Sequence, residues 1–363
     1  MKGIENNMKK LNIAVIFGGC SPEYSVSLES AYAVIRFLDR ERYHLVMVGI
    51  SEWGDWFYFQ GDIEKIKEDL WLNDDDCTPA VFSPNRSKHQ LLLLKDTGIE
   101  TVGIDAAFPV LHGKNGEDGT VQGAIELAGI PLVGCGVLAS ALCMDKDRAH
   151  KLAELAGVHV PKAMVLDKGR QARDVSAFAE RTGFPLFVKP VRAGSSYGVT
   201  KVQKEEELLE AVALAFQYDD QVIVEENIDG FEVGCAVMGD DILNVGEVDE
   251  IELSGGFFDF TEKYTLKTSE IHLPARIEPE KSDEIKQTAE VIYKALGCSG
   301  FARVDMFLTP EGRIVFNEVN TIPGFTEHSR YPGMMKAAGI PIEEVLRRII
   351  DQAMKRSRGG EEL

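Results

Sequence analysis

The stretch CSGFARVDMFLTPEGRIVFNEVNTIPGFT, residues 298–326, predicts two paired β-strands that carry acidic side chains. Successive side chains of a strand point to opposite faces of the sheet. Arg303 and Asp305 therefore share one face of the first strand. In the same way, Glu318 and Asn320 share one face of the second strand. This alternation favours a hairpin over a solvated helix.

A turn at residues 310–312 joins the two strands, because Pro fixes the φ of a turn position and Gly accepts a positive φ. The hairpin then brings the four polar side chains to one face. Carboxylates and an amide oxygen suit Mg²⁺ when phosphates fill its other positions, and a nearby Arg suits a phosphoryl group. We therefore predict a metal-dependent phosphoryl-transfer site. The alternative is a half-exposed hairpin with a salt bridge between Arg303 and Glu318.

Composition limits the functions that fit this site. The chain has 363 residues, enough for two or three domains with substantial cores. Its formal charge is −20, from 39 basic and 59 acidic residues, which argues against nonspecific binding to nucleic acid or to an anionic membrane surface. No apolar run approaches the roughly 20 residues that span a bilayer, and the N-terminus does not resemble a signal peptide.

The six cysteines are scattered, with no CxxC pair and no His at zinc-finger spacing. This pattern suggests neither a zinc site nor a disulfide framework. A reducing cytoplasm is therefore the expected location.

The N-terminal third predicts a β-α-β unit. NIAVIF (12–17) is typical of a buried strand, SLESAYAVIRFLD (27–39) has helical spacing, and YHLVMVGIS (43–51) predicts a second strand. A parallel sheet with a right-handed crossover is expected from this order. Ligands of such sheets bind beyond the carboxyl ends of the strands, which makes the loop with Glu23 at its centre a candidate site.

A second β-to-α unit covers residues 106–134, AAFPVLHGKNGEDGTVQGAIELAGIPLVG. Its apolar strand ends at His112, and a Gly-rich polar loop follows. A lone His is commonly a structural residue with satisfied hydrogen bonds. The adjoining loop HGKNGEDG favours a role in a site instead.

The central part of the chain predicts a phosphate-binding hairpin at residues 183–202. Its loop contains Ser195 and Ser196 between glycines, and Lys189 ends the first strand. Backbone amides, hydroxyls and this cation could surround a phosphate, although such loops are commonly plain hairpin turns. Neither GxxxxGK[ST] nor GxGxxG occurs, so a bound nucleotide would require another fold.

An acidic loop follows within VIVEENIDGFEVGCAVMG, residues 222–239. Glu225 and Glu232 lie in or beside apolar strands, and carboxylates there can accept hydrogen bonds from an adenine amino group and a ribose diol. A solvated acidic loop explains the same pattern equally well. The next segment, residues 248–274, is rich in aromatic residues, Gly and Lys, and could close over reacting ligands.

Taken together, these motifs resemble the D-alanine-D-alanine ligases of the ATP-grasp superfamily. The resemblance runs from about residue 11 to 352, and several motifs are most similar to the vancomycin-resistance branch, in particular its D-alanine-D-serine ligases. Eight motifs occur in the family's order, namely NIAVIFGGCSPEYSVSL, LHGKNGEDG, ALCMDKDRAHK, FVKPVRAGSSYGV, VEENIDGFEVG, FFDFTEKY, GFARVDMF and FNEVNTIPGFTEHSRYP.

The resemblance implies an α/β fold with three domains, near 1–134, 135–230 and 231–363, with ATP between the last two. It implies an N-terminal Rossmann-like domain, a central ATP-grasp subdomain and a C-terminal domain with the metal and catalytic residues. The implied nucleotide contacts are Lys146, Lys189, Ser196, Glu225, Glu232 and Lys263. The implied ligands of two Mg²⁺ ions, for which Mn²⁺ could substitute, are Asp305, Glu318 and Asn320.

The resemblance also implies the reaction. ATP would phosphorylate the carboxylate of a first D-alanine, and the amine of a second D-amino acid would attack the acyl phosphate. Arg303 and the backbone amide of Gly324 match the family's oxyanion site, where one donor is typically worth ~3 kcal/mol. The remaining matches are Glu23 and His112 at the first D-alanine, Ser195 and Tyr264 closing the loop, and Ser329 at the second substrate's carboxylate.

The second substrate stays open between D-alanine and D-serine. Tyr264, within FDFTEKY, argues against D-lactate, because D-lactate ligases of the family carry a different loop with a His. Asp249 and Arg330 are polar candidates that could pair with the hydroxyl of D-serine, since a site built for a hydroxyl rejects the analogue that lacks it.

Two other functions fit parts of the sequence. A different ATP-grasp carboxylate-amine ligase would keep the nucleotide and metal residues, but not Glu23, Ser195 and Tyr264 together. A non-catalytic nucleotide-binding protein would tolerate the loss of Arg303 or Asp305. The expected partners are small-molecule substrates, with neither nucleic acid nor membrane, and the resemblance implies a homodimer.

Overall fold

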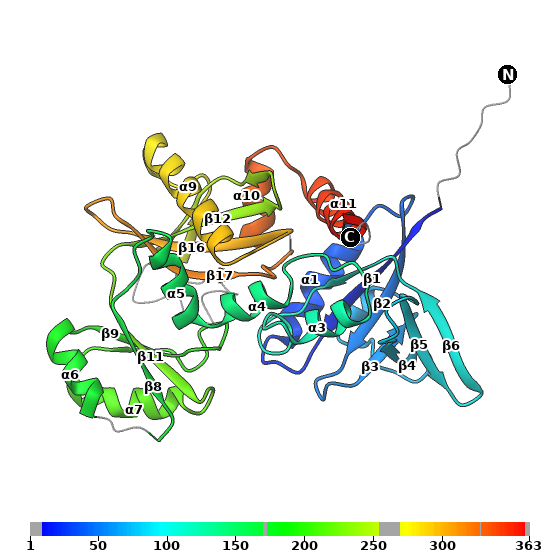
Figure 1. Ribbon diagram of the computed structural model, residues 1–363, viewed down its shortest axis with the longest axis horizontal. Coiled ribbons are helices and arrows are strands. Elements are labelled where there is room, and N and C mark those ends of the chain that lie inside the picture. The colour runs from blue at the N-terminus through cyan, green and yellow to red at the C-terminus, as the bar shows by residue number, and fades with distance from the viewer. Residues whose placement is uncertain (1–8, 170–172, 254–268, 327, 360–363) are drawn as a thin grey trace.

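The computed structural model describes residues 9–169, 173–253, 269–326 and 328–359. Three β-sheets with flanking helices make up its architecture (Figure 1). The N-terminal sheet lies on the right of Figure 1, and the central and C-terminal sheets lie on the left. The mixed α/β class predicted from the sequence is confirmed. None of the helices within the described residues is long and apolar enough to cross a membrane.

The N-terminal sheet has seven strands in the order β6-β5-β4-β3-β2-β1-β7. β1 pairs in parallel with β2 and β7, which confirms the predicted β-α-β unit. Residues 52–103 add antiparallel strands to its other edge. The elements of this part are β1 (Leu11–Gly18), α1 (Tyr24–Phe37), β2 (Tyr43–Ile50), β3 (Trp56–Phe59), α2 (Glu64–Lys67), β4 (Cys77–Phe82), β5 (Gln90–Lys95), β6 (Gly98–Gly103), β7 (Ala106–Pro109) and α3 (Thr120–Leu127).

The central sheet is antiparallel and has four strands in the order β10-β9-β11-β8. The strands predicted around the Gly/Ser loop are confirmed as β9 and β10. Two helices pack with this sheet, and their apolar residues share one core with it. The elements are β8 (Ala163–Asp167), α6 (Arg173–Thr182), β9 (Leu186–Pro190), β10 (Thr200–Val202), α7 (Glu205–Ala215) and β11 (Gln221–Glu226).

The C-terminal sheet has six strands in the order β15-β14-β12-β16-β17, with β13 paired to β12. Its elements are β12 (Phe231–Gly239), β13 (Leu243–Val245), β14 (Asp249–Leu253), β15 (Ser269–His272), α9 (Pro279–Ala295), β16 (Phe301–Leu308), β17 (Ile314–Asn320), α10 (Arg330–Ala337) and α11 (Ile342–Gly359). Two helices that precede the central sheet, α4 (Val137–Met144) and α5 (Lys146–Leu155), contact β17.

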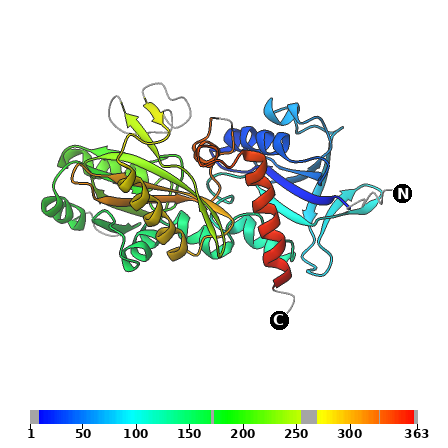
Figure 2. The same cartoon turned by 90° about the horizontal axis from the view of Figure 1, so that it is seen from above.

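Two of the hydrophobic cores cross the predicted domain boundaries. The α5 residues Ala149 and Ala153 are buried in one core with the C-terminal sheet. A second core joins α1 and β7 to α10 and α11, and Phe108 packs edge-on against Phe301 at 5.9 Å. Figure 2 shows α11 running along the junction between the N-terminal sheet and the rest of the molecule. These shared cores join the N-terminal sheet to the C-terminal part of the chain and fix α5 against the C-terminal sheet.

Candidate active site

The predicted hairpin forms, and it carries the predicted polar cluster. β16 and β17 are antiparallel, with Arg303 opposite Asn320 and Asp305 opposite Glu318. The turn places Pro310 and Glu311 at its centre, and the amide of Gly312 donates to Thr309 over 2.9 Å. Gly312 has a φ of +81°, as the turn prediction required.

Asp305 is the centre of this cluster. Its carboxylate accepts from Arg303 Nε at 2.8 Å and from Asn320 Nδ2 at 2.9 Å. It also lies 3.2 Å from Arg330 Nη1. Burial alone would raise the pKa of Asp305, but the charges of Arg303 and Arg330 outweigh burial and lower it. Asp305 is therefore charged.

The alternative interpretation of the hairpin, a salt bridge between Arg303 and Glu318, does not describe the observed pairing. Arg303 forms its ion pair with Asp305, on its own strand, at 2.7 Å. Glu318 lies instead 3.5 Å from Lys146 Nζ. Two carboxylates and an amide group thus line one face beside two arginines and a lysine. This donor set fits a hard divalent cation bound together with phosphate oxygens.

A cavity of about 470 Å³ opens between the central and C-terminal sheets. It has the size expected for a small-molecule site, and its walls combine apolar and charged side chains. Phe187, Ile251 and Phe307 contribute apolar surface. All five nucleotide-binding residues predicted within the described chain line this cavity, namely Lys146, Lys189, Ser196, Glu225 and Glu232. The sixth, Lys263, lies outside the described residues.

Lys146 and Lys189 enter the cavity from different elements. Lys146 begins α5 and donates to the carbonyl of Ala193 at 2.8 Å. Lys189, on β9, pairs with Glu225 at 2.7 Å, and its Nζ lies 5.5 Å from the ring centroid of Phe187. Two cations at one wall suit the phosphates of a nucleotide.

The sequence prediction missed two further cations of the cavity wall, Lys201 and Arg276. Lys201 lies opposite Phe187 in the β9–β10 register and stands 5.6 Å from the same ring centroid. The alternation of side chains in the strand after the Gly/Ser loop could have indicated Lys201. Arg276 pairs with Glu250, a contact that no local pattern indicates.

Glu23 lies where the loops of two domains meet. It precedes α1, and the hydroxyl of Ser195 donates to its carboxylate. The same carboxylate lies against the backbone of Gly113 and Gly194. Ser195 and its neighbour Ser196 have φ values of 48° and 59°, a left-handed conformation that costs free energy in residues other than Gly. The predicted pairing of Glu23 with Ser195 is therefore present, whereas Tyr264 lies outside the described residues.

His112 is a buried, neutral residue that joins two loops. Its Nδ1 donates to the carbonyl of Ile322 at 3.0 Å, and its Nε2 accepts from Ser30 at 3.1 Å. Burial lowers the pKa of His112 to about 4, so the ring is uncharged at neutral pH. Both ring nitrogens are satisfied by protein partners, so neither offers a free hydrogen bond to a substrate.

Glu117 is a half-buried carboxyl that the sequence prediction missed. It accepts from the amide of Gly113 at 2.9 Å and from the amide of Ile322 at 3.0 Å. Burial raises the pKa of Glu117 to about 8, and the charge of Glu23 adds to this effect. Glu117 thus ties the loop beside Glu23 to the loop that carries Gly324. The motif HGKNGEDG contains it, but only the fold reveals its two amide partners.

Gly324 and Ser329 adjoin each other at the start of α10. A Cβ at residue 324 would lie 2.7 Å from Ser329 Oγ, so only glycine leaves room for this approach. Ser329 Oγ accepts from the amide of Thr326 at 3.0 Å. The amides at this helix start and the hydroxyl could bind a carboxylate.

Arg330 links residues that were predicted to bind metal and nucleotide. It donates to both oxygens of Asp249 at 2.7 and 2.8 Å and to Glu232 at 2.9 Å. The structure therefore brings together Asp249 and Arg330, the two polar residues that were predicted near the second substrate. Asp249 is fully buried, so it could influence the second substrate only through Arg330.

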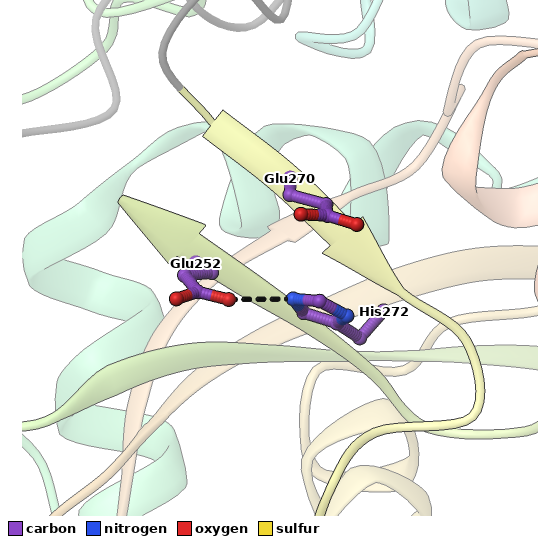
Figure 3. A group of neighbouring side chains, drawn as sticks. All are labelled: Glu252, Glu270 and His272. Atoms are coloured by element: carbon purple, nitrogen blue, oxygen red, sulfur yellow. Dashed lines mark hydrogen bonds and ion pairs between the residues drawn. The ribbon is translucent and has the colours of Figure 1, made fainter. Parts of the chain in front are cut away.

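The hairpin of β14 and β15 borders residues 254–268, which are not described. Glu252, Glu270 and His272 lie close together on it (Figure 3). Glu252 is already paired with His272 at 2.7 Å and with Arg276 at 2.8 Å. Glu252 and Glu270 are exposed, which distinguishes this cluster from the buried Asp305 and its partners.

Comparison with known proteins agrees with this geometry. Residues 12–135 match the family described as "D-ala D-ala ligase N-terminus", and residues 152–351 match "D-ala D-ala ligase C-terminus". The vancomycin B-type resistance protein VanB of Enterococcus faecalis is 46% identical over 354 residues, covering 96% of this chain and 100% of VanB. A D-alanine–D-alanine ligase of Caldicellulosiruptor bescii is 42% identical, covering 97% of each chain.

A solved structure supports the same assignment. The VanG D-Ala:D-Ser ligase of Enterococcus faecalis superposes with a TM-score of 0.89 at 54% identity, covering 95% of this chain and 100% of VanG. The D-alanine-D-alanine ligase of Coxiella burnetii superposes with a TM-score of 0.87 at 31% identity, covering 97% and 96%. The predicted resemblance and the ATP-grasp fold are confirmed. The chain belongs to the D-alanine–D-alanine ligase family.

Proposed function

We propose that this protein joins D-alanine to a second D-amino acid, at the expense of ATP, to make a peptidoglycan precursor. One observation carries the proposal above the others. Glu23 with Ser195, the lysines of the cavity, and the cluster around Asp305 come from three different parts of the fold, and contacts connect them. Ser196, next to Ser195, lines the cavity, and Lys146 of the cavity lies 3.5 Å from Glu318, which is opposite Asp305 in the hairpin. An unrelated nucleotide-binding protein would not need the first of these groups.

The reaction we propose has two steps. The carboxylate oxygen of the first D-alanine attacks the terminal phosphorus of ATP, which forms an acyl phosphate and releases ADP. The amine of the second D-amino acid then attacks the acyl carbon, and inorganic phosphate leaves as the C–N bond forms. The ammonium group of the second D-amino acid loses one proton to solvent to become the attacking amine and a second as the amide forms, so one hydrogen stays on the amide nitrogen.

The residues have distinct tasks in this scheme. Glu23 would hold the ammonium group of the first D-alanine, while Lys146 and Lys189 would hold the ATP phosphates. Arg303 and the amide of Gly324 would stabilise the oxyanion of the tetrahedral intermediate, a contribution of about 3 kcal/mol for one donor. Ser329 would bind the carboxylate of the second substrate. His112 would stabilise this arrangement through its hydrogen bond to the carbonyl of Ile322.

A divalent metal is part of this activity. We propose two Mg²⁺ ions held by Asp305, Glu318 and Asn320, with Mn²⁺ as a possible substitute. When bound, the metal neutralises the charge that develops on the transferred phosphoryl group. Arg303 and Asn320 contact Asp305 in the described structure, so they would hold its carboxylate in position for the cation.

The choice of acceptor is a separate proposal. VanG, the neighbour with 54% identity, is a D-Ala:D-Ser ligase, whereas the relative from Caldicellulosiruptor bescii is a D-alanine–D-alanine ligase. We propose that Arg330, aimed by Asp249, contributes to the discrimination between D-serine and D-alanine. We further propose a homodimer, which rests on the family resemblance, and a cytoplasmic location, which rests on the scattered cysteines.

Trapping of the intermediate tests the proposed function. The purified protein is incubated with Mg²⁺, ATP, D-alanine and hydroxylamine, without a second amino acid in excess. Hydroxylamine should capture the acyl phosphate as D-alanine hydroxamate, with one ADP for each hydroxamate. ADP release that does not depend on D-alanine, or hydroxamate from a different carboxylate only, would count against the proposal. L-alanine is the matched control.

A further inference from the structure

Behind the nucleotide cavity, His150 faces a carboxylate without a hydrogen bond. His150 lies one helical turn after Lys146 on α5 and is 4% exposed. Its ring packs edge-on against Phe316, with centroids 5.3 Å apart. Its Nδ1 lies 3.5 Å from Oε1 of Glu225. Among the described residues, neither of these two atoms has a hydrogen-bond partner.

The other ring nitrogen fixes one proton of His150. Nε2 lies 2.8 Å from the backbone carbonyl of Asn317. A carbonyl oxygen can only accept, so Nε2 must carry a hydrogen. A neutral ring would then direct the lone pair of Nδ1 at the carboxylate of Glu225, and two buried acceptors would face each other. A second proton, on Nδ1, turns this repulsion into an ion pair.

The opposite oxygen of Glu225 connects this pair to the cavity. Glu225 is 2% exposed, and its Oε2 lies 2.7 Å from Lys189 Nζ. Burial would raise the pKa of Glu225, but Lys189, His150 and Lys146 together lower it. Glu225 therefore stays charged and lies between His150 on the protein side and Lys189 on the cavity side.

We propose that His150 is a positioning residue for the nucleotide site, which holds Glu225 from behind so that Glu225 directs Lys189 at the nucleotide phosphates. This inference rests on the proposed function of the cavity.

The inference predicts a pH dependence with a definite sign. His150 Nδ1 faces Glu225 on β11, and Glu225 in turn feels the charges of Lys189 on β9 and Lys146 on α5. Loss of the Nδ1 proton at higher pH would set the ring lone pair against Glu225. Glu225 would then shift toward Lys189 and draw it from the phosphates. Nucleotide affinity should therefore fall as pH rises.

Two variants and one control test this role. His150→Gln removes the second ring proton, and His150→Phe keeps a flat ring beside Phe316 without either N–H. His159→Gln is the control, because His159 is exposed and lies in the loop after the same helix. The dissociation constant of Mg-ADP is measured by titration calorimetry between about pH 6 and pH 9, the range around ordinary His titration. Melting temperatures show whether each variant is folded.

We expect both His150 variants to bind Mg-ADP about tenfold more weakly at pH 6, with KM for ATP raised and KM for D-alanine unchanged. Wild type and His159→Gln should bind Mg-ADP more weakly as pH rises. The affinity of each His150 variant should instead stay at its pH 6 value. Equal affinity and an equal pH profile in wild type and His150→Gln would overturn the inference. A wild type that binds no nucleotide would instead refute the proposed function itself.

Nitrogen NMR of the ring gives an independent answer. The chain has seven histidines, so the signals of His150 can be assigned by their loss in His150→Gln. Two protonated ring nitrogens near pH 6 support the inference. A neutral ring over the whole pH range, with the hydrogen on Nε2 alone, overturns it.

Discussion

Replacing Gly234 by Ala should break the buried contact between Arg330 and Asp249. A Cβ at residue 234 would lie 2.2 Å from Arg330 Nη2 and 2.7 Å from Asp249 Oδ1. Ordinary contacts between such atoms begin at about 3.5 Å. The guanidinium must therefore retreat by about 1 Å, which lengthens its 2.8 Å bond to Asp249 beyond hydrogen-bond range.

The cost follows from the burial of this pair. Asp249 is fully buried, and breaking a buried ion pair while its charges remain costs about 3–5 kcal/mol. For a chain of 363 residues, this loss corresponds to a drop in melting temperature of about 4–7 °C. Arg330 would also release Glu232, so the KM for ATP should rise.

Calorimetric melting and steady-state ADP release measure both effects. Gly103→Ala is the matched control, because nothing lies within 4 Å of a Cβ at residue 103. It should change the stability by less than about 1 kcal/mol. If Gly234→Ala melts and turns over like Gly103→Ala, Arg330 is not held in the way the structure indicates, and the reasoning fails.

Three further predictions concern single side chains. Arg303→Ala should abolish turnover while Mg-ADP still binds in calorimetry, because Arg303 would act on the transition state; residual turnover above a hundredth of wild type would contradict this role. Arg330→Ala and Asp249→Ala should both shift the ratio of D-alanyl-D-serine to D-alanyl-D-alanine in a mixed assay, and an unchanged ratio would remove them from acceptor choice. Burial raises the pKa of Glu117 from 4.5 to about 8. Between these two pH values the folded state keeps a proton on Glu117 that the unfolded state has released. The stability of the wild type relative to Glu117→Gln, measured by urea unfolding, should therefore decline from pH 4.5 to pH 8; a rising difference would contradict the assignment.

Local sequence patterns predicted the elements of the site well. The alternation within residues 298–326 correctly indicated a hairpin that brings Asp305 opposite Glu318. It did so because a strand's period of two and a Pro-Glu-Gly turn are both local properties. The order of strands and helices likewise predicted the parallel β-α-β unit at the N-terminus.

The contacts that connect the elements could not be predicted from local patterns. Arg330 reaches Asp305 and Asp249 only because α10 packs against β12 beside β14 and β16. Glu117 and His150 depend in the same way on loops and strands that are distant in sequence. Such contacts follow from the packing of whole sheets, which leaves no periodic signal in the chain.

Product analysis of the complete reaction tests the central claim most directly. The purified protein is given Mg²⁺, ATP and D-alanine, alone and with equimolar D-serine or D-lactate, and ADP and the products are quantified by mass. The account predicts one ADP for each D-alanyl product, with D-alanine or D-serine as the second residue. ADP without any D-alanyl product, or a product formed only from other substrates, would contradict it.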